Sequence, residues 1–174
     1  MTGSCNVITL NINRIVQDWF TFINHLHYGN TGENLKPNEV FNSKCSLPNY
    51  LEGILGRVYK YHIAFKTMLY DLEDKGMFAA SNGGYIHISK LYSTIGINGL
   101  NEAARFLGLT VSNNPEYIKF LQLILSTIKE QNKLHSIKDK KRPFIFNSEC
   151  VPAENLSYKN YNWDKADGLE PMSI

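Results

Sequence analysis

The stretch Val7-Ile8-Thr9-Leu10-Asn11-Ile12 decides the fold class, because it carries the clearest strand pattern in the chain. Apolar and polar side chains alternate along it, and several are β-branched, as is typical of a short β-strand. Directly behind it, from Arg14 to about His27, apolar side chains recur at helical spacing and form one wide stripe. We therefore predict a strand that is followed at once by a helix.

Further elements follow from the same periodicity and from signals at helix ends. The predicted helices are residues 47–75, closed by Gly76, residues 101–107, closed by Gly108, and residues 115–135. Between them we expect a turn at residues 29–34, a short strand at 86–88, a tight glycine loop at 96–100 and a solvated loop at 138–142.

The last part of the chain repeats the order of strand and helix. Residues 143–151 have the apolar and β-branched character of a second strand. Pro152-Ala153-Glu154-Asn155 then opens a helix, because proline suits the first turn and an acidic side chain there complements the helix dipole. Strands that alternate with helices predict an α/β architecture with parallel strands.

Composition and charge limit the classes of protein that are possible. The 174 residues include 18 Lys+Arg and 16 Asp+Glu, which gives a net charge of +2, and 43% are hydrophobic. Such a chain can bury a sizeable core, and it lacks the basic excess that nucleic-acid-binding proteins carry. It has no apolar run of the ~20 residues that span a bilayer, and no signal-peptide pattern. We therefore expect a cytoplasmic protein with neither a nucleic-acid nor a membrane partner.

Three residues stand out as candidates for chemistry. Cys5, just before the first strand, is either a redox thiol that meets another cysteine in space or a small buried apolar side chain. Asn11 lies at the far end of the same strand. Glu154 is either an acid or base beside a phosphate-binding helix terminus, or a capping carboxylate. No metal site is expected, because no cysteine pair has C-x-x-C spacing and no histidine lies at ligand spacing from a cysteine.

Three segments resemble one enzyme family, and they occur in the right order. Residues 92–104, Tyr-Ser-Thr-Ile-Gly-Ile-Asn-Gly-Leu-Asn-Glu-Ala-Ala, are similar to a T-I-G-x-x-G-L-x-E-A segment of that family. Residues 5–14 resemble its barrel strand behind the radical-cysteine finger loop, and residues 151–155 with 161–165 resemble its strand and helix near the substrate. The family is that of the anaerobic (class III, glycyl-radical) ribonucleoside-triphosphate reductases.

This resemblance implies that residues 1–174 form a single segment of a ten-stranded α/β barrel. In the family, a protein thiyl radical removes the 3′-hydrogen of a ribonucleotide, water leaves from C2′, and formate or a thiol supplies electrons. By resemblance, Cys5 lies where thiol-reduced members keep a reducing cysteine, and Glu154 lies beside the substrate hydroxyl. The implied substrate contacts are Asn11, Ala153, Asn155 and Leu156, the last three through N–H groups that bind phosphate.

The resemblance also implies groups that lie outside this sequence. The radical-bearing cysteine is expected before Met1, and the glycyl-radical loop and a structural four-cysteine zinc site beyond Ile174. The implied partners are a ribonucleoside triphosphate, the remaining reductase segments and a radical-SAM activase, and the isolated chain is expected to be inactive. The alternative is a non-enzymatic interaction module that retains reductase ancestry. An incomplete barrel is expected to expose apolar helix faces and strand edges.

Overall fold

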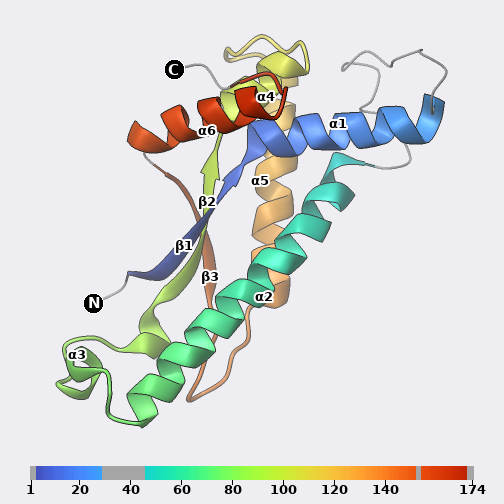
Figure 1. The fold of residues 1–174 in the computed structure, drawn as a ribbon. Helices are drawn as coiled ribbons and strands as arrows, with labels where there is room; N and C mark the ends of the chain where they lie inside the picture. Colours follow the sequence, from blue (N-terminus) through green and yellow to red (C-terminus); the bar gives the residue numbers. More distant parts are fainter. Residues whose placement is uncertain (1–2, 29–45, 152–153, 172–174) are drawn as a thin grey trace.

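The computed structural model describes residues 3–28, 46–151 and 154–171, and strands alternate with helices in these ranges (Figure 1). The elements are β1 (Ser4–Asn11), α1 (Ile12–Tyr28), α2 (Leu47–Asp74), α3 (Ala79–Asn82), the 3-10 helix η2 (Ile88–Lys90), β2 (Tyr92–Asn98), α4 (Leu100–Phe106), α5 (Pro115–His135), β3 (Phe146–Cys150) and α6 (Glu154–Ala166). This order confirms the predicted α/β architecture.

The three strands form one parallel sheet in the order β1-β2-β3. In the register of the sheet, Leu10 lies beside Ile97, which lies beside Cys150. Because the strands are parallel, their carboxyl ends lie at the same edge. α1 follows β1 without a gap, α4 follows β2 after one residue, and α6 follows β3 (Figure 1). Three helices therefore begin at the carboxyl edge of the sheet.

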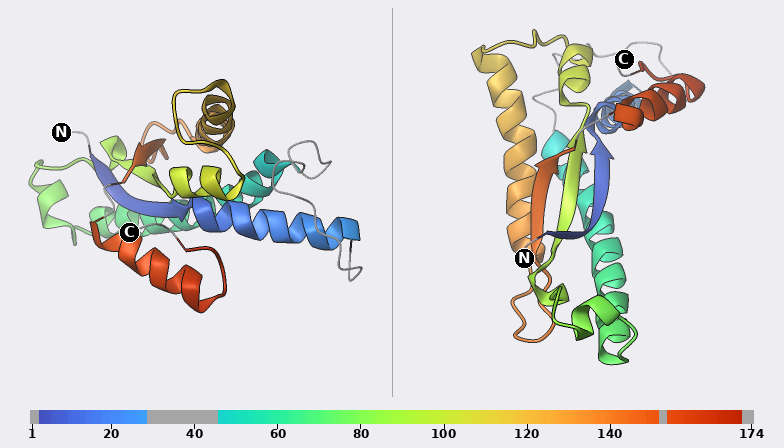
Figure 2. Two further views of the ribbon diagram at one scale, coloured as in Figure 1. Left: turned by 90° about the horizontal axis from the view of Figure 1, so that it is seen from above. Right: turned by 90° about the vertical axis from the view of Figure 1, so that its left-hand side faces the viewer.

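Helices lie on both faces of the sheet. α2 and α5 pack together on one face, and α6 crosses the other face near the carboxyl ends of the strands (Figure 2). The core lies between the sheet and α1, α2, α4 and α5, and each of these elements contributes buried apolar side chains to it. Examples are Leu10, Trp19, Leu55, Ile95, Ala104 and Ile124. The helical members belong to the apolar stripes that the sequence spacing predicts.

Side-chain caps begin two of the helices, and the predicted stop glycines of two helices are confirmed. Ser46 caps α2 and Asn114 caps α5, each by accepting a hydrogen bond from a backbone N–H in the first turn. Gly76 and Gly108 follow α2 and α4 with φ angles of 71° and 76°, in the left-handed region that favours glycine. α1 begins at Ile12, two residues earlier than predicted.

The predicted glycine loop at residues 96–100 was wrong, since most of it is the end of the central strand. β2 continues to Asn98, and the turn begins at Gly99, where φ is 80°. Gly96 is needed inside the strand because its neighbours approach closely: a Cβ there would lie 2.5 Å from Thr9 Oγ1 and 2.7 Å from Val151 Cγ2. Glycine is depleted in strands, so composition favours a loop where packing requires a strand.

Two other sequence predictions were wrong. Residues 86–88 form no strand, because the chain there enters η2. The N–H groups of Lys90 and Leu91 donate to carbonyls three residues earlier, so these backbone groups are used locally. Cys5 lies within β1, at an irregularity in the register, and not before the strand. The predicted turn at 29–34 lies outside the described residues.

The predicted loop at residues 138–142 is confirmed, and most of its side chains are exposed. Arg142 pairs with Asp71 at 2.9 Å and with Asp74 at 2.5 Å, both in the last turns of α2. Such exposed ion pairs contribute little stability individually. They hold the segment that leads into β3 against the end of α2.

The close contact at Gly96 gives a testable consequence for stability. Gly96→Ala places a methyl group against Thr9 and Val151, so the free energy of unfolding is expected to fall by roughly 1–3 kcal/mol. Gly53→Ala is the matched control, because a Cβ at this position of α2 meets nothing within 4 Å. It is expected to raise stability by about 0.5–1 kcal/mol. Urea denaturation measures both variants, and equal stabilities would contradict the strand packing described for Gly96.

Candidate functional site

The carboxyl edge of the sheet places two asparagines side by side. Asn11 ends β1 and Asn98 ends β2, and they are partners in the parallel register. Asn11 Oδ1 accepts a hydrogen bond from the N–H of Arg14 (3.1 Å) and so caps α1. Asn98 Oδ1 accepts one from the N–H of Gly99 (2.8 Å), whereas its buried Nδ2 has no partner among the described residues. Amide groups therefore line this edge.

A buried carboxylate from α6 meets the same edge. Asp164 is fully buried, and its two oxygens accept hydrogen bonds from Asn11 Nδ2 and Asn13 Nδ2, both at 3.4 Å. Burial raises the pKa of Asp164 above its ordinary value, while the hydrogen bonds from Asn13 and Asn11 act in the opposite direction. This carboxylate joins α6 to the corner between β1 and α1.

Two further contacts hold the end of α6 against α1. Arg14 pairs with Asp167 at 2.6 Å, in a partly exposed position. Gln17 Nε2 donates to the carbonyl of Glu170 (2.7 Å), and the N–H of Glu170 donates to Gln17 Oε1 (2.8 Å). Together with the contact between Asp164 and Asn13, these contacts fix α6 and the segment that follows it to α1.

The predicted phosphate-binding residues lie at the other end of α6. Glu154 is the first residue of the helix, Asn155 is exposed and Leu156 is partly buried. The first N–H groups of a helix have no partner within it, so those of Asn155 and Leu156 are available to an anion. Asp164 lies ten residues further on, about 15 Å along the helix. Ala153 and the side chain of Glu154 lie outside the described part of the chain.

Cys5 lies near the opposite edge of the sheet. Its thiol donates to the carbonyl of Tyr92 (3.2 Å) and lies 3.6 Å from Ser93 Oγ. Cys5 and Asn11 are six positions apart in β1, a distance of about 20 Å along an extended strand. The structure therefore does not bring Cys5 together with Asn11.

The two cysteines in the described ranges are both free. Cys150 is level with Leu10 in the register, so more than about 15 Å separates it from Cys5. A disulfide requires Cα atoms within about 7 Å, so these two residues cannot form one in this fold. Cys45 lies outside the described residues.

A buried polar cluster between α2 and the sheet was missed by the sequence reasoning. His62 is fully buried, with Nδ1 3.0 Å from Asn6 Oδ1 and with no partner for Nε2 among the described residues. Burial lowers the pKa of His62 to about 4. Lys66, one turn later, is also fully buried and donates to the carbonyl of Leu91 (2.6 Å), and burial lowers its pKa. Their spacing could have predicted their burial, because His62 and Lys66 occupy positions at which the buried apolar stripe of α2 continues.

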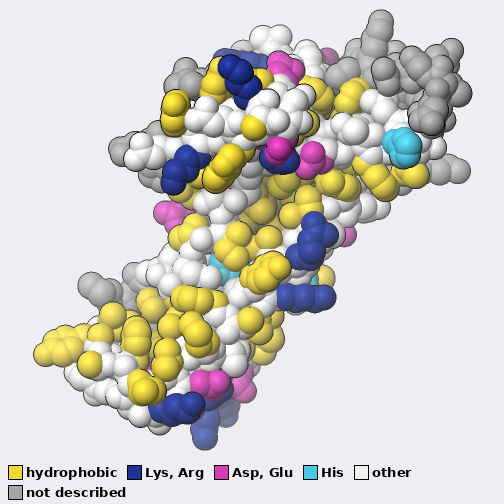
Figure 3. Space-filling view, in the orientation of Figure 1, with side chains coloured by type: hydrophobic (Ala, Val, Ile, Leu, Met, Phe, Trp, Pro, Cys, Tyr) yellow, Lys and Arg dark blue, Asp and Glu magenta, His cyan; other side chains and the backbone are white. Residues whose placement is uncertain are grey.

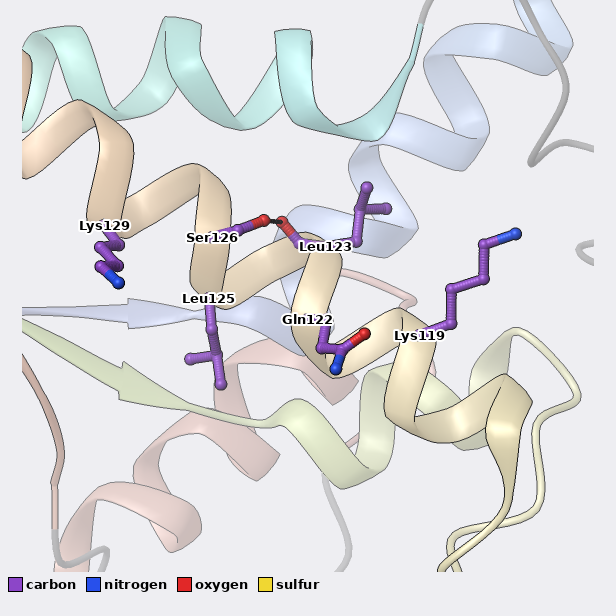
Figure 4. A pocket seen from close by; sticks show the side chains of 6 residues that line it. All are labelled: Lys119, Gln122, Leu123, Leu125, Ser126 and Lys129. Carbon is purple, nitrogen blue, oxygen red and sulfur yellow. Dashed lines mark hydrogen bonds between the residues drawn. The ribbon is translucent and has the colours of Figure 1, made fainter.

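Two surface hollows lie away from the carboxyl edge. One runs along α5, and all of its lining residues belong to that helix (Figure 4): Lys119, Gln122, Leu123, Leu125, Ser126 and Lys129. The other, of about 510 Å³, lies where α1, α2, α4 and α5 meet, above Trp19 and Phe120. Neither is lined by Asn11, Asn98 or a residue of α6. Both hollows therefore lie outside the candidate site.

The described ranges contain neither a cluster of metal ligands nor a membrane-spanning helix. No group of three or more His, Cys, Asp or Glu side chains there could hold a metal ion, so these residues do not fit a zinc site. No helix in the same ranges is long and apolar enough to cross a bilayer.

The sequence matches one protein family over nearly its whole length. The family model for anaerobic ribonucleoside-triphosphate reductase matches residues 1–169. The chain belongs to this family. The resemblance first seen at residues 92–104 is thereby confirmed over nearly the whole sequence, whereas none of the curated proteins matches it.

Solved anaerobic ribonucleotide reductases share the fold of the chain. The enzyme from Thermotoga maritima with citrate in the active site is 23% identical, with a TM-score of 0.74 over 99% of this chain and 28% of that chain. The same enzyme in complex with dATP and CTP is 22% identical, with a TM-score of 0.75 over 99% of this chain and 26% of that chain. The chain thus spans about a quarter of the length of these reductases and corresponds to a segment of their fold.

The buried histidine predicts a pH dependence of stability. Because the pKa of His62 is about 4 in the folded state and 6.5 ordinarily, the unfolded state binds the proton more tightly. The contribution of neutral His62 to the free energy of unfolding is therefore complete above pH 6.5. It is lost as the pH falls toward 4, and the total loss is about 3 kcal/mol. Urea denaturation between pH 7 and 4 measures this loss.

His62→Gln serves as the comparison, since glutamine does not titrate. The pKa values of Asp164 and Asp18 are raised, so their protonation increases the free energy of unfolding as the pH falls and opposes the effect of His62. Both residues are the same in the variant. The difference between the two proteins therefore isolates the histidine. Parallel stability curves for the two proteins would show that His62 is not buried as described.

Proposed function

We propose that this chain forms part of the substrate-binding wall of an anaerobic ribonucleoside-triphosphate reductase in the cytoplasm. The observation that carries the proposal is the carboxyl edge of the sheet, where Asn11 and the start of α6 follow two strands of one parallel sheet. Ligands of open α/β sheets bind outside the carboxyl ends of the strands. The substrate class is taken from the family and from the Thermotoga maritima structure that contains dATP and CTP.

The amino terminus of α6 provides the groups for substrate binding in this proposal. The N–H groups of Asn155 and Leu156 in the first turn bind the phosphates, together with the N–H of Ala153 that the family resemblance implies, because a helix amino terminus attracts negative charge. After the thiyl radical of the remaining segments has removed the 3′-hydrogen, Glu154 accepts the proton of the 3′-hydroxyl as a general base. The C2′ hydroxyl takes a proton from the thiol of Cys5 and leaves as water. The amide of Asn11 contacts the substrate from the end of β1.

Cys5 is the proposed thiol reductant. The half-exposed, free thiol supports this role. Its distance from Cys150 requires that its redox partner come from outside the described residues. The position of Cys5 near the opposite edge also requires that the sugar, and not the phosphates, extend toward it.

The remaining reductase segments are proposed to cover the apolar side of α2. Tyr61, Phe65 and Met68 lie on one face of that helix and are 70%, 36% and 49% exposed. More exposed hydrophobic residues flank α3, and Figure 3 shows hydrophobic side chains gathered over this part of the molecule. An incomplete barrel segment was expected to expose such a face. The same missing segments supply the radical-bearing cysteine, the glycyl radical and the zinc site, and an activase generates the radical.

An activity assay of the isolated and the assembled protein tests this proposal. The chain alone, with activase and reductant supplied, is expected to reduce no ribonucleotide. Co-expression with the reading frames that flank its gene is expected to restore reduction of a ribonucleoside triphosphate to the deoxyribonucleotide. Turnover by the isolated chain would refute the proposal that it is one segment of a larger enzyme.

Substitution of Glu154 tests its assigned role in the assembled enzyme. Glu154→Gln removes the base and is expected to lower kcat by about 10²–10⁴-fold, with KM little changed. Glu130→Gln is the matched control, because Glu130 is an exposed residue of α5 far from the sheet edge. An unchanged kcat in Glu154→Gln would leave the carboxylate with a structural role.

A further inference from the structure

Asp164 is a buried carboxylate, and within the described ranges it makes no hydrogen bond to a cation. Its oxygens accept hydrogen bonds from two different amides, Asn11 Nδ2 and Asn13 Nδ2. The nearby cation, Arg14, is instead engaged by Asp167 at 2.6 Å and by Asp18 at 3.9 Å, both on the surface. A carboxylate that is fully removed from water and satisfied by neutral amides is costly to bury. Its position therefore needs an explanation beyond the stability of α6.

The orientation of the Asn11 side chain provides that explanation. Asn11 Oδ1 is used by the N–H of Arg14, so the amide presents Nδ2 on its other side. Asp164 accepts from this Nδ2, and a flipped amide would place oxygen against carboxylate oxygen. The amide of Asn13 also presents Nδ2 to Asp164, and the same Nδ2 donates to the carbonyl of Glu170 (3.0 Å). The carboxylate thus selects one of the two amide orientations at each asparagine.

We infer that Asp164 is a positioning residue of the candidate site: it orients the Asn11 amide toward one side and anchors α6 across the strand ends. This inference rests on the proposed function, in which Asn11 and the start of α6 contact the nucleotide. Asp164 itself lies about 15 Å from Glu154 along the helix and does not touch substrate. Its effect reaches the substrate through Asn11 and through the placement of α6.

The protonation of Asp164 provides a spectroscopic signature of this role. The charged groups that face it are Arg14 and Asp18 from α1 and Asp167 from the end of α6. β2 carries no charged side chain, and α4, which begins at the same edge, carries Glu102 in its first turn. Protonation removes one of the two acceptors, so the side-chain amides of Asn11 and Asn13 must respond together. Because burial raises the pKa of Asp164, this response is expected above pH 3.8.

Side-chain amide NMR of the full chain, labelled with ¹⁵N, is the first test. In the unmodified protein, the signals of Asn11 and Asn13 are expected to titrate with one shared midpoint above pH 3.8. Asp164→Asn is expected to abolish this titration and to shift both signals. Asp167→Asn and Asp18→Asn are the matched controls, because they remove the neighbouring charges but keep the contacts of Asp164, and both are expected to retain the titration. Independent behaviour of the two amides, or an unchanged titration in Asp164→Asn, would overturn the inference.

Kinetics of the assembled reductase are the second test. Asp164→Ala is expected to lower kcat/KM by about 10²-fold, because a misoriented amide and a displaced helix disturb substrate geometry. Asp164→Asn keeps the shape and one acceptor, so it is expected to recover part of that loss, while Glu130→Gln, an exposed change on α5, stays close to the unmodified enzyme. Equal kcat/KM values in Asp164→Ala and the unmodified enzyme would overturn the inference. If the amides titrate as expected but CTP shifts no signal at the strand ends and Glu154→Gln has no kinetic effect, the proposed function fails, and the orienting contact itself stands.

Discussion

The parallel pairing of β1 with β2 is the constraint on which the rest of the structure depends. It places Asn11 beside Asn98 and so brings the starts of α1 and α4 to one edge. The pairing is close because Gly96 has no side chain to separate it from Thr9 and Val151. Since β3 adds to the other side of β2 in the same direction, the start of α6 joins the same edge. A single register therefore assembles the candidate site from residues that are more than 140 positions apart in the chain.

Buried polar groups lie at both ends of the sheet. At the carboxyl edge, Asp164 is satisfied by two asparagine amides, and α6 is held by contacts with α1. Near the amino edge, His62 and Lys66 lie behind the sheet and beside the strand that carries Cys5. Burial acts on both ends in the same physical way, because it disfavours the charged form and raises the pKa of the acid but lowers the pKa of the bases.

The distance between these ends shapes the proposed chemistry. Cys5 and Asn11 belong to one strand, so their separation of about 20 Å is set by the extended backbone and cannot close without loss of the sheet. A substrate that contacts both must therefore lie along β1, with its phosphates toward α6. The chain spans about a quarter of the solved reductases, and the exposed apolar face of α2 marks where further segments are expected to pack.

The sequence by itself indicated helices α1, α2, α4, α5 and α6, two of their stop glycines and the family of this protein. Amphipathic periodicity, first-turn prolines and stop glycines are local signals, and the segment at residues 92–104 is specific enough to indicate anaerobic reductases. Tertiary structure alone decided that Gly96 belongs to the central strand, because the reason for that glycine is a contact with Thr9 and Val151 from two other segments. It also decided the roles of His62 and Asp164, whose burial depends on neighbours distant in sequence. Local patterns are set by neighbouring residues, whereas burial and close approach are set by the packing of the whole chain.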